Sequence, residues 1–120
     1  MAAALQPVRL SGRMQRLVQG TSDLRCEPWA RPGAAVEVAL GPDEPPPEWD
    51  RAVAVYLNGR RLGWVNGGGE AMRGHLRRAW AAGWYVVVPG AVEIVQGAPS
   101  VRLSAPWPDA VAAWFDGLVR

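Results

Sequence analysis

The stretch Pro42–Trp64 reads PDEPPPEWDRAVAVYLNGRRLGW, and it joins a proline-rich acidic segment to a β-hairpin. Two β-like runs, Ala52–Leu57 and Arg60–Val65, flank the pair Asn58-Gly59. Asparagine followed by glycine is the pair that most readily takes positive φ at both central positions of a type I′ turn. The sequence therefore predicts a tight antiparallel hairpin.

A two-residue turn also fixes which side chains face each other across the two strands. The expected pairs are Val55–Leu62 and Val53–Trp64 on the apolar face and Tyr56–Arg61 on the other. The Tyr56–Arg61 pair suits a cation–π contact that exposes basic charge. Trp64 has two possible roles, as a core residue on the apolar face or as an aromatic residue near a ligand.

The segment before the hairpin, Gly41–Asp50, contains four prolines. Proline has no backbone N–H and a fixed φ, so this segment cannot join a central strand and is stiff. We expect an exposed loop that holds Glu48, Trp49 and Asp50 at a fixed place.

Other strands are predicted on both sides of the hairpin. The alternation of Ala34–Leu40 is typical of a half-buried strand, which should pair with the hairpin. Short β-like runs bounded by turn residues predict further strands. These are Leu24–Trp29, Trp84–Val88, Ala91–Gln96 and Ser100–Ser104, with Pro89-Gly90 as a turn.

Two helices are predicted. Gly68–Ala82 has helical spacing and should pack through Met72, Leu76 and Trp80. Pro108 lies in the first turn of a second helix, whose apolar stripe has i, i+3, i+4, i+7 spacing. The stripe consists of Val111, Trp114, Phe115 and Leu118. It packs either on the rest of the chain or on another chain, so we divide the chain into a β domain at 1–105 and a helix at 106–120.

Composition limits the function classes. The chain has 120 residues, a net charge of +2 and 13 basic residues, all arginine, together with seven tryptophans. Arginine and tryptophan suit nucleic-acid backbones and unstacked bases, although the low net charge requires a local patch. With a single cysteine, Cys26, and a single histidine, His75, we expect no disulfide, metal site, catalytic pair or cofactor. The N-terminus lacks a signal-peptide pattern and no apolar run is long enough for a membrane span, so a cytoplasmic location is expected.

From Pro32 onward, the order of motifs resembles the HIRAN domain family. The matching pieces are Asp43-Glu44-Pro45, Trp49-Asp50, Ala52-Val53-Ala54-Val55 and Gly59-Arg60-Arg61-Leu62-Gly63-Trp64-Val65. The resemblance covers about residues 32–104. It implies a mainly β, α+β fold: an OB-like antiparallel β-barrel with a helix between strands, followed here by the C-terminal amphipathic helix. It also implies capture of the 3′ end of single-stranded DNA.

The loop departs from the family's Asn-Pro-Tyr-Asp pattern. A one-residue deletion aligns Trp49 and Asp50 with Tyr-Asp, whereas alignment from the Ala-Val strand would place Glu48 and Trp49 there. We favour the first alignment because it keeps an aromatic residue beside an acid. It implies that Trp49 stacks on the terminal base and that Asp50 accepts a hydrogen bond from the 3′ hydroxyl. The ordinary alternative is that Trp49 caps the edge of the sheet and Asp50 closes a turn.

Basic and polar residues complete the candidate DNA site. Its full membership is Trp49, Asp50, Arg51, Tyr56, Arg60, Arg61, Trp64, Asn66, Arg73 and Arg77. Asn66 and the glycines that follow it precede a helix whose N-terminal amides could bind a phosphate or simply form a cap. Arg73 and Arg77 should share an exposed helix face, where pairing with Glu70 is the alternative to contact with a DNA backbone.

The sequence thus predicts a non-enzymatic module that binds single-stranded DNA, preferably at 3′ ends, in DNA repair, replication or defence. Its protein partner would be a helicase, a nuclease or another protein that docks on the C-terminal helix. The alternative is a structural or adaptor domain of a larger assembly, such as a phage particle, without DNA binding. The altered loop, the low charge and the C-terminal stripe favour that alternative.

Overall fold

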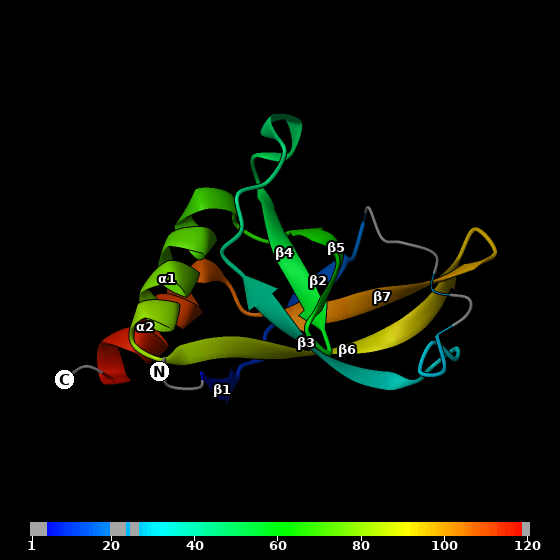
Figure 1. Ribbon diagram of the computed structural model, residues 1–120, viewed down its shortest axis with the longest axis horizontal. Helices are drawn as coiled ribbons and strands as arrows, with labels where there is room; N and C mark the ends of the chain where they lie inside the picture. Colours follow the sequence, from blue (N-terminus) through cyan, green and yellow to red (C-terminus); the bar gives the residue numbers. More distant parts are fainter. Residues whose placement is uncertain (1–4, 20–23, 25–26, 119–120) are drawn as a thin grey trace.

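The computed structural model describes residues 5–19, 24 and 27–118. The elements in these ranges follow one another along the chain in a mainly β order (Figure 1). They are β1 (Gln6–Arg9), β2 (Met14–Leu17), β3 (Ala35–Gly41), the 3₁₀ helix η1 (Pro47–Trp49), β4 (Ala52–Leu57), β5 (Arg60–Asn66), α1 (Gly69–Ala81), β6 (Trp84–Val95), β7 (Ala98–Ala105) and α2 (Pro108–Leu118). The prediction of an α+β, barrel-like fold with one helix between strands and one at the C-terminus is confirmed.

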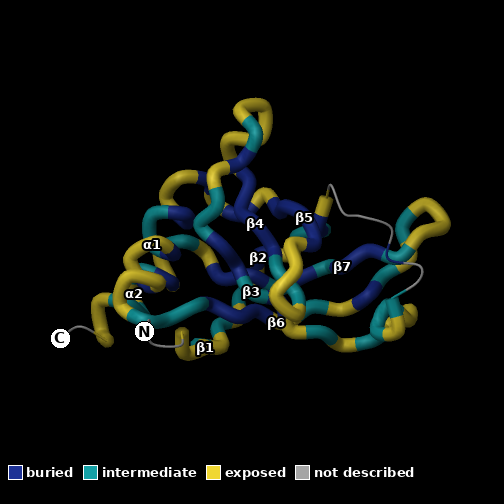
Figure 2. Tube along the Cα trace, viewed as in Figure 1, coloured by how far each residue is buried: buried dark blue, intermediate teal, exposed yellow. Residues whose placement is uncertain are grey.

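The strands form one curled sheet in the order β2-β7-β6-β3-β4-β5, and β1 lies parallel to the first half of β6. The two ends of the sheet meet just beyond β2. There the Gln19 amide donates to the Trp64 carbonyl at 2.7 Å, and the Trp64 amide donates to the Gln19 carbonyl at 2.8 Å. The curl encloses the main core, to which every strand from β2 to β7 contributes a buried side chain (Figure 2).

The β4–β5 hairpin has the predicted turn, since Asn58 and Gly59 have φ values of 53° and 79°. The predicted Tyr56–Arg61 pair is also present, but the pairs expected further from the turn are wrong. A β-bulge makes Leu62 an extra residue on β5, so that Val55 lies opposite Gly63 and Ala54 lies opposite Trp64. Because side chains alternate between faces, this one-residue slip turns Trp64 to the outer face of the sheet.

The two strands predicted around Pro89-Gly90 are one continuous strand, β6. The Val87 carbonyl accepts a hydrogen bond from the Leu10 amide, so it points to the edge of β6 that pairs with β1. Backbone groups two residues apart point to the same edge, so the nitrogen of Pro89 also points there. At that point β1 has ended, and the pairing with β7 begins only at Gly90. Proline is tolerated in the strand because no partner there needs its missing N–H.

Two further expectations, on the core contact of α1 and on a strand at Leu24–Trp29, need correction. Trp80 is not part of the core contact of α1: it is 42% exposed, and the buried face consists of Met72, Leu76 and Ala79 with Gly69 and Arg73. The strand expected at Leu24–Trp29 is wrong in its described part, where residues 27–30 form a turn. Cys26 lies outside the described residues.

Helix α2 packs beside α1 in the same chain, and the two helices lie together at one end of the sheet (Figure 1). Val111 is fully buried, and Trp114 makes an edge-to-face contact with Trp84 at 5.9 Å between ring centroids. The guanidinium of Arg78 lies over the Phe115 ring at 5.2 Å. Within the stripe, Val111 is thus fully covered by this chain and Trp114 and Phe115 are half-buried, whereas Leu118 is 41% exposed.

Candidate nucleic-acid interface

The proline-rich loop ends in η1 and projects from the sheet between β3 and β4 (Figure 1). Pro46 has the extended φ and ψ of −54° and 147°, and its carbonyl accepts a hydrogen bond from the Trp49 amide at 2.9 Å. Three consecutive prolines restrict the backbone up to this turn. The loop thus presents Trp49 with 38% of its surface exposed.

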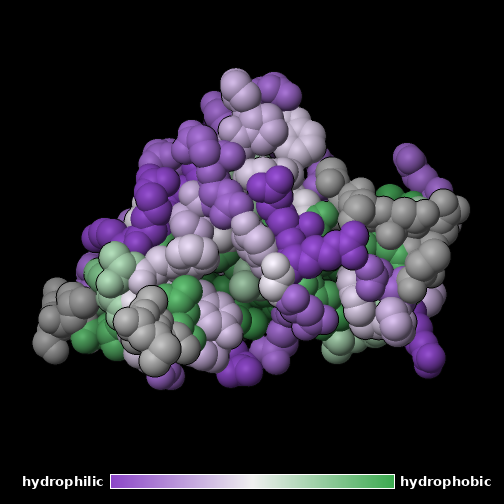
Figure 3. Space-filling view, viewed as in Figure 1, coloured by the Kyte–Doolittle hydropathy of each residue, from purple (hydrophilic) through white to green (hydrophobic). Residues whose placement is uncertain are grey.

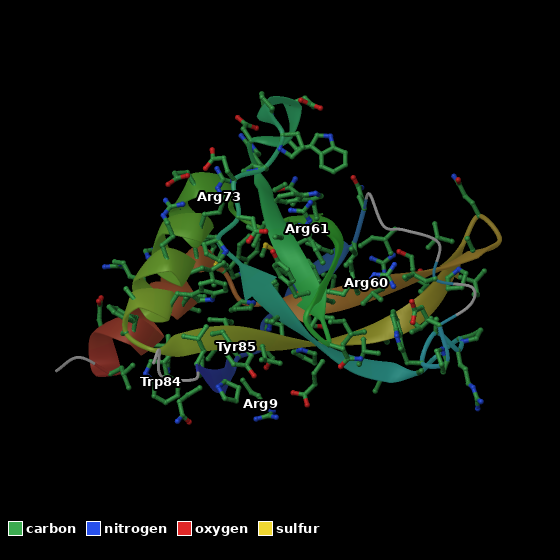
Figure 4. All side chains as sticks on the ribbon, viewed as in Figure 1. Arg9, Arg60, Arg61, Arg73, Trp84 and Tyr85 are labelled. Atoms are coloured by element: carbon green, nitrogen blue, oxygen red, sulfur yellow. The ribbon has the colours of Figure 1, made fainter. Side chains whose placement is uncertain are left out.

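Arg73 fixes the other end of the loop, and here the sequence prediction is wrong. Arg73 is only 4% exposed, and one guanidinium nitrogen donates to the carbonyls of Asp50 at 3.0 Å and Ala52 at 2.7 Å. Its other terminal nitrogen contacts Glu70 at 3.2 Å. Figure 4 shows Arg73 on α1 beside the start of β4. Arg73 therefore holds the loop in place and cannot meet a DNA backbone.

Beneath the loop lies a cavity of about 260 Å³, which we call the tryptophan pocket. Five of the ten predicted site residues line it, namely Trp49, Asp50, Arg51, Trp64 and Asn66. The other lining residues are Gln19, Glu48, Ala52 and Val65. The loop, the first residues of β4 and the end of β5 thus bring two indoles and two acidic residues, Glu48 and Asp50, to one cavity.

Trp64 reaches this pocket because of the β-bulge. It packs with Ala52 and Ala54 on the outer face and is 9% exposed. The guanidinium of Arg61 lies 4.9 Å from its ring, so the cation–π contact of Arg61 is with Trp64 and not with Tyr56 as predicted. Trp64 is therefore buried, but on the outer face and not in the main core on the apolar face, and its indole lines the candidate site.

A second cavity of about 250 Å³, the arginine pocket, adjoins the first, and Arg51 and Asn66 line both. It adds Met14, Arg16, Gly68 and Trp107, which the sequence reasoning did not place in the site. The Arg16 side chain donates to the Asn66 carbonyl at 2.9 Å, and Trp107 is 55% exposed. Trp107 lies between two prolines in the sequence, which could have marked it as a rigidly presented aromatic residue.

The N-terminus of α1 is less available to a phosphate than the sequence suggested. The amides of Gly67 and Gly69 both donate to the Arg51 carbonyl, at 3.2 and 3.1 Å. These two amides form the cap that was the alternative prediction. The basic groups of the site are instead the side chains of Arg16 and Arg51, and Arg51 makes no ion pair among the described residues.

The remaining predicted residues lie outside both cavities. Arg60 contacts Glu27 at 2.8 Å, Arg61 contacts Asp43 at 3.4 Å, and Arg77 forms an ion pair with Glu70. The Arg77 hydrogen bond, with a smaller effect from Arg73, lowers the pKa of Glu70. Glu70 thus pairs with Arg73, as the alternative predicted, although Arg73 is buried and not on a solvated face, and it also pairs with Arg77.

Tyr56 also lies away from the tryptophan pocket. Its hydroxyl donates to the Asp43 carboxylate, and its ring covers Gly41 so closely that a Cβ there would come within 2.6 Å of it. Burial of the ring, followed by the contact with Asp43, raises the pKa of Tyr56 above 10.0. Tyr56 thus fastens the start of the proline-rich loop to β4.

No family model, curated protein or solved structure matches this chain. No helix in residues 5–19, 24 and 27–118 combines the length and apolar character that crossing a bilayer requires. In that part of the chain, no group of three or more His, Cys, Asp or Glu side chains is placed to hold a metal ion.

Proposed function

We propose that this protein is a non-enzymatic module that binds single-stranded DNA, preferably at its 3′ end, through the tryptophan pocket. One observation carries the proposal: Trp49, Trp64 and Asp50 line the same cavity. Stacking on an aromatic side chain is worth about 1–3 kcal/mol for each base and tolerates any base sequence. The braced loop that carries Trp49 reduces the entropy lost when a base binds.

The polar residues of the pocket give the proposed preference for an end. A free 3′ hydroxyl can donate a hydrogen bond, whereas an internal nucleotide has no such O–H on its 3′ oxygen. The Asp50 carboxylate would accept this hydrogen bond, and a 3′ phosphate would instead be repelled by its negative charge. The resemblance of the loop and hairpin to the HIRAN domain, a 3′-end-binding module, supports the same assignment.

The arginine pocket would receive the phosphates. Arg51 lies at the junction of the two cavities and Arg16 lies beyond it, so a strand leaving the tryptophan pocket would meet both guanidinium groups. Trp107 offers a further exposed ring on this path. The proposed site does not use the other four candidate arginines, because each lies outside both cavities and contacts an acidic residue. These are Arg60, Arg61, Arg73 and Arg77.

Fluorescence anisotropy with 5′-labelled single-stranded oligonucleotides tests the end preference. The 3′-hydroxyl oligonucleotide should bind at least tenfold more tightly than its 3′-phosphate counterpart, and Asp50→Asn should remove most of that difference. Equal affinity for the two oligonucleotides in the unmodified protein would refute end recognition.

The alternative, a structural or adaptor domain, loses its main argument. The C-terminal stripe that suggested docking on another chain packs against α1 and Trp84. We therefore do not propose that a helicase or nuclease docks on that stripe. A role in repair, replication or defence would follow from binding of a DNA end.

A further inference from the structure

A hollow larger than either cavity of the candidate DNA site lies outside that site. It has a volume of about 600 Å³ and lies on the outer face of the sheet, between α1, β1, β6, β3 and the β4–β5 turn. We call it the outer pocket. In the space-filling view, hydrophobic residues form a floor between α1 and the strands, with more hydrophilic residues around it (Figure 3). Cavities of about 300–1,000 Å³ are the usual size for small-molecule sites.

Three aromatic residues from three different elements line the outer pocket: Tyr56 on β4, Trp80 on α1 and Tyr85 on β6. None of them makes an aromatic stacking contact within the described part of the chain. Trp80 is the residue expected in the core of α1 but found 42% exposed. Exposure of a large indole at the wall of a hollow is a common feature of a binding site, because burial by a ligand would be favourable.

Unpartnered polar groups lie among these rings. The Tyr85 hydroxyl, the Trp80 indole N–H and the Asn58 side-chain amide make no hydrogen bond to another described residue, and a ligand could replace the water on them. A few placed polar groups above an apolar floor are what orient a small ligand in a pocket. The floor itself is aliphatic, with Ala39 and Val87 on neighbouring strands.

The charge at the rim is balanced. The Arg9 side chain donates to the Glu37 carboxylate at 2.8 Å, and among the residues that the structure describes these are the only charged ones that line the pocket. Figure 4 shows Arg9 on β1 next to Tyr85 on β6. The pocket therefore offers no excess positive charge to a phosphate, in contrast to Arg16 and Arg51 in the arginine pocket.

A peptide strand is a poor match for this hollow. The strands beneath it are paired to each other, β1 with β6, β6 with β3, and β3 with β4, and among the described strands the unpaired edge here is the side of β1 that faces away from β6. Addition of a peptide strand requires an unpaired backbone edge, and the outer pocket opens over the face of the sheet.

We propose that the outer pocket is a second binding site, which takes an uncharged planar heterocycle of nucleoside size. The ring of this ligand stacks against Trp80 or Tyr85, and its polar edge forms hydrogen bonds with the Tyr85 hydroxyl and the Asn58 side-chain amide. This site is independent of DNA binding, because none of its lining residues lines the tryptophan pocket or the arginine pocket.

The test uses adenosine as the probe and follows the tryptophan indole N–H signals by NMR together with titration calorimetry. To keep adenosine out of the tryptophan pocket, the titration uses the Trp49→Ala background, in which adenosine should shift the Trp80 signal and leave that of Trp107 in place. Trp80→Ala should weaken binding at least tenfold and Tyr85→Phe about threefold. Ile94→Ala, which removes an exposed apolar side chain far from all these cavities, serves as the control and should change the affinity less than twofold.

Several outcomes would overturn the inference. Adenosine at millimolar concentration could leave the Trp80 signal unchanged, or adenosine 5′-monophosphate could bind much more tightly than adenosine. Loss of calorimetric adenosine binding in Trp49→Ala, with binding kept in Trp80→Ala, would place adenosine in the tryptophan pocket instead. Trp80 is 42% exposed, so part of its indole also packs on the fold. A thermal unfolding curve for Trp80→Ala therefore accompanies the titration, and loss of binding at a temperature where the variant is fully folded reflects loss of the ring.

Discussion

At the residue scale, Arg73 determines whether the proposed DNA site exists. A helix arginine at i+3 from a glutamate is usually a solvated surface residue, and the sequence gives no sign that this one is buried. The carbonyls of Asp50 and Ala52 need a donor where the loop enters β4, and the guanidinium group supplies it. Only the tertiary contact between α1 and the loop reveals this role.

Replacing Arg73 should therefore destabilise the fold. Arg73→Met removes charge-assisted hydrogen bonds to two carbonyls, so the free energy of unfolding should fall by about 2–3 kcal/mol. Urea denaturation measures this change. Arg77→Met, one turn further on and exposed, is the matched control and should cost less than about 0.5 kcal/mol. Similar values for the two variants would contradict the anchoring role of Arg73.

Tyr56 gives a prediction about pH. The chain has two tyrosines, so Tyr85→Phe leaves Tyr56 as the only phenol, whose ionisation can be followed by ultraviolet absorbance. Burial and the hydrogen bond to Asp43 raise its pKa, so the midpoint should lie above pH 10.0. A raised pKa means that the neutral phenol stabilises the fold fully below pH 10.0, and this stabilisation is lost as the pH rises through the folded-state pKa.

Asp43→Asn in the same background should lower that midpoint, because the amide lacks the negative charge that opposes ionisation of the phenol. A midpoint at or below pH 10.0 before this substitution, or no response to it, would show that the Tyr56–Asp43 contact is absent in solution.

At the element scale, the bulge in β5 links the hairpin to the site. The sequence predicted the turn correctly because Asn58-Gly59 has a local conformational preference. It did not predict the extra residue, which depends on how Gly63 meets the segment after β2. A Cβ on Gly63 would lie 2.3 Å from the Gln19 carbonyl oxygen, so the two strands can approach only at glycine.

Gly63→Ala should consequently weaken closure of the sheet. The added methyl group overlaps a backbone oxygen, and we expect a loss of about 1–3 kcal/mol in the free energy of unfolding. Gly74→Ala adds the same methyl group inside α1, where the nearest atom is 3.9 Å away, and should stabilise by about 0.5–1 kcal/mol. Chemical denaturation of both variants should show opposite signs. A neutral Gly63→Ala would mean that β2 and β5 do not meet as described.

The elements that the sequence predicted well are those with strong local signals: β3, the hairpin, α1 and α2. The errors arose where tertiary contacts override local preference. Pro89 remains inside β6 because its sheet partner changes at that residue, and Trp80 remains exposed although it continues the apolar stripe of α1. For the site, the loop residues could be predicted because prolines fix them, whereas Arg16 and Trp107 join through contacts between distant segments.

At the scale of the whole molecule, the net charge is only +2, and many arginines form ion pairs with acidic residues. Only Arg16 and Arg51 face the proposed path of a strand, so DNA binding should depend only weakly on salt. Each phosphate contact on a single strand contributes about −0.7 to the slope of log K against log salt concentration. We therefore expect a slope of about −1 to −2 between 50 and 200 mM salt, and a slope beyond about −4 would indicate a wider basic surface.

The central claim is that Trp49 and the pocket beneath it hold the end of a DNA strand. The most direct measurement compares the affinity of a labelled single-stranded 3′-hydroxyl oligonucleotide for the unmodified protein, Trp49→Ala and the control Ile94→Ala. Loss of one base stack should weaken binding by Trp49→Ala about tenfold or more, with Ile94→Ala within about twofold of the unmodified protein. Unchanged affinity in Trp49→Ala, or no binding by the unmodified protein, would contradict the claim.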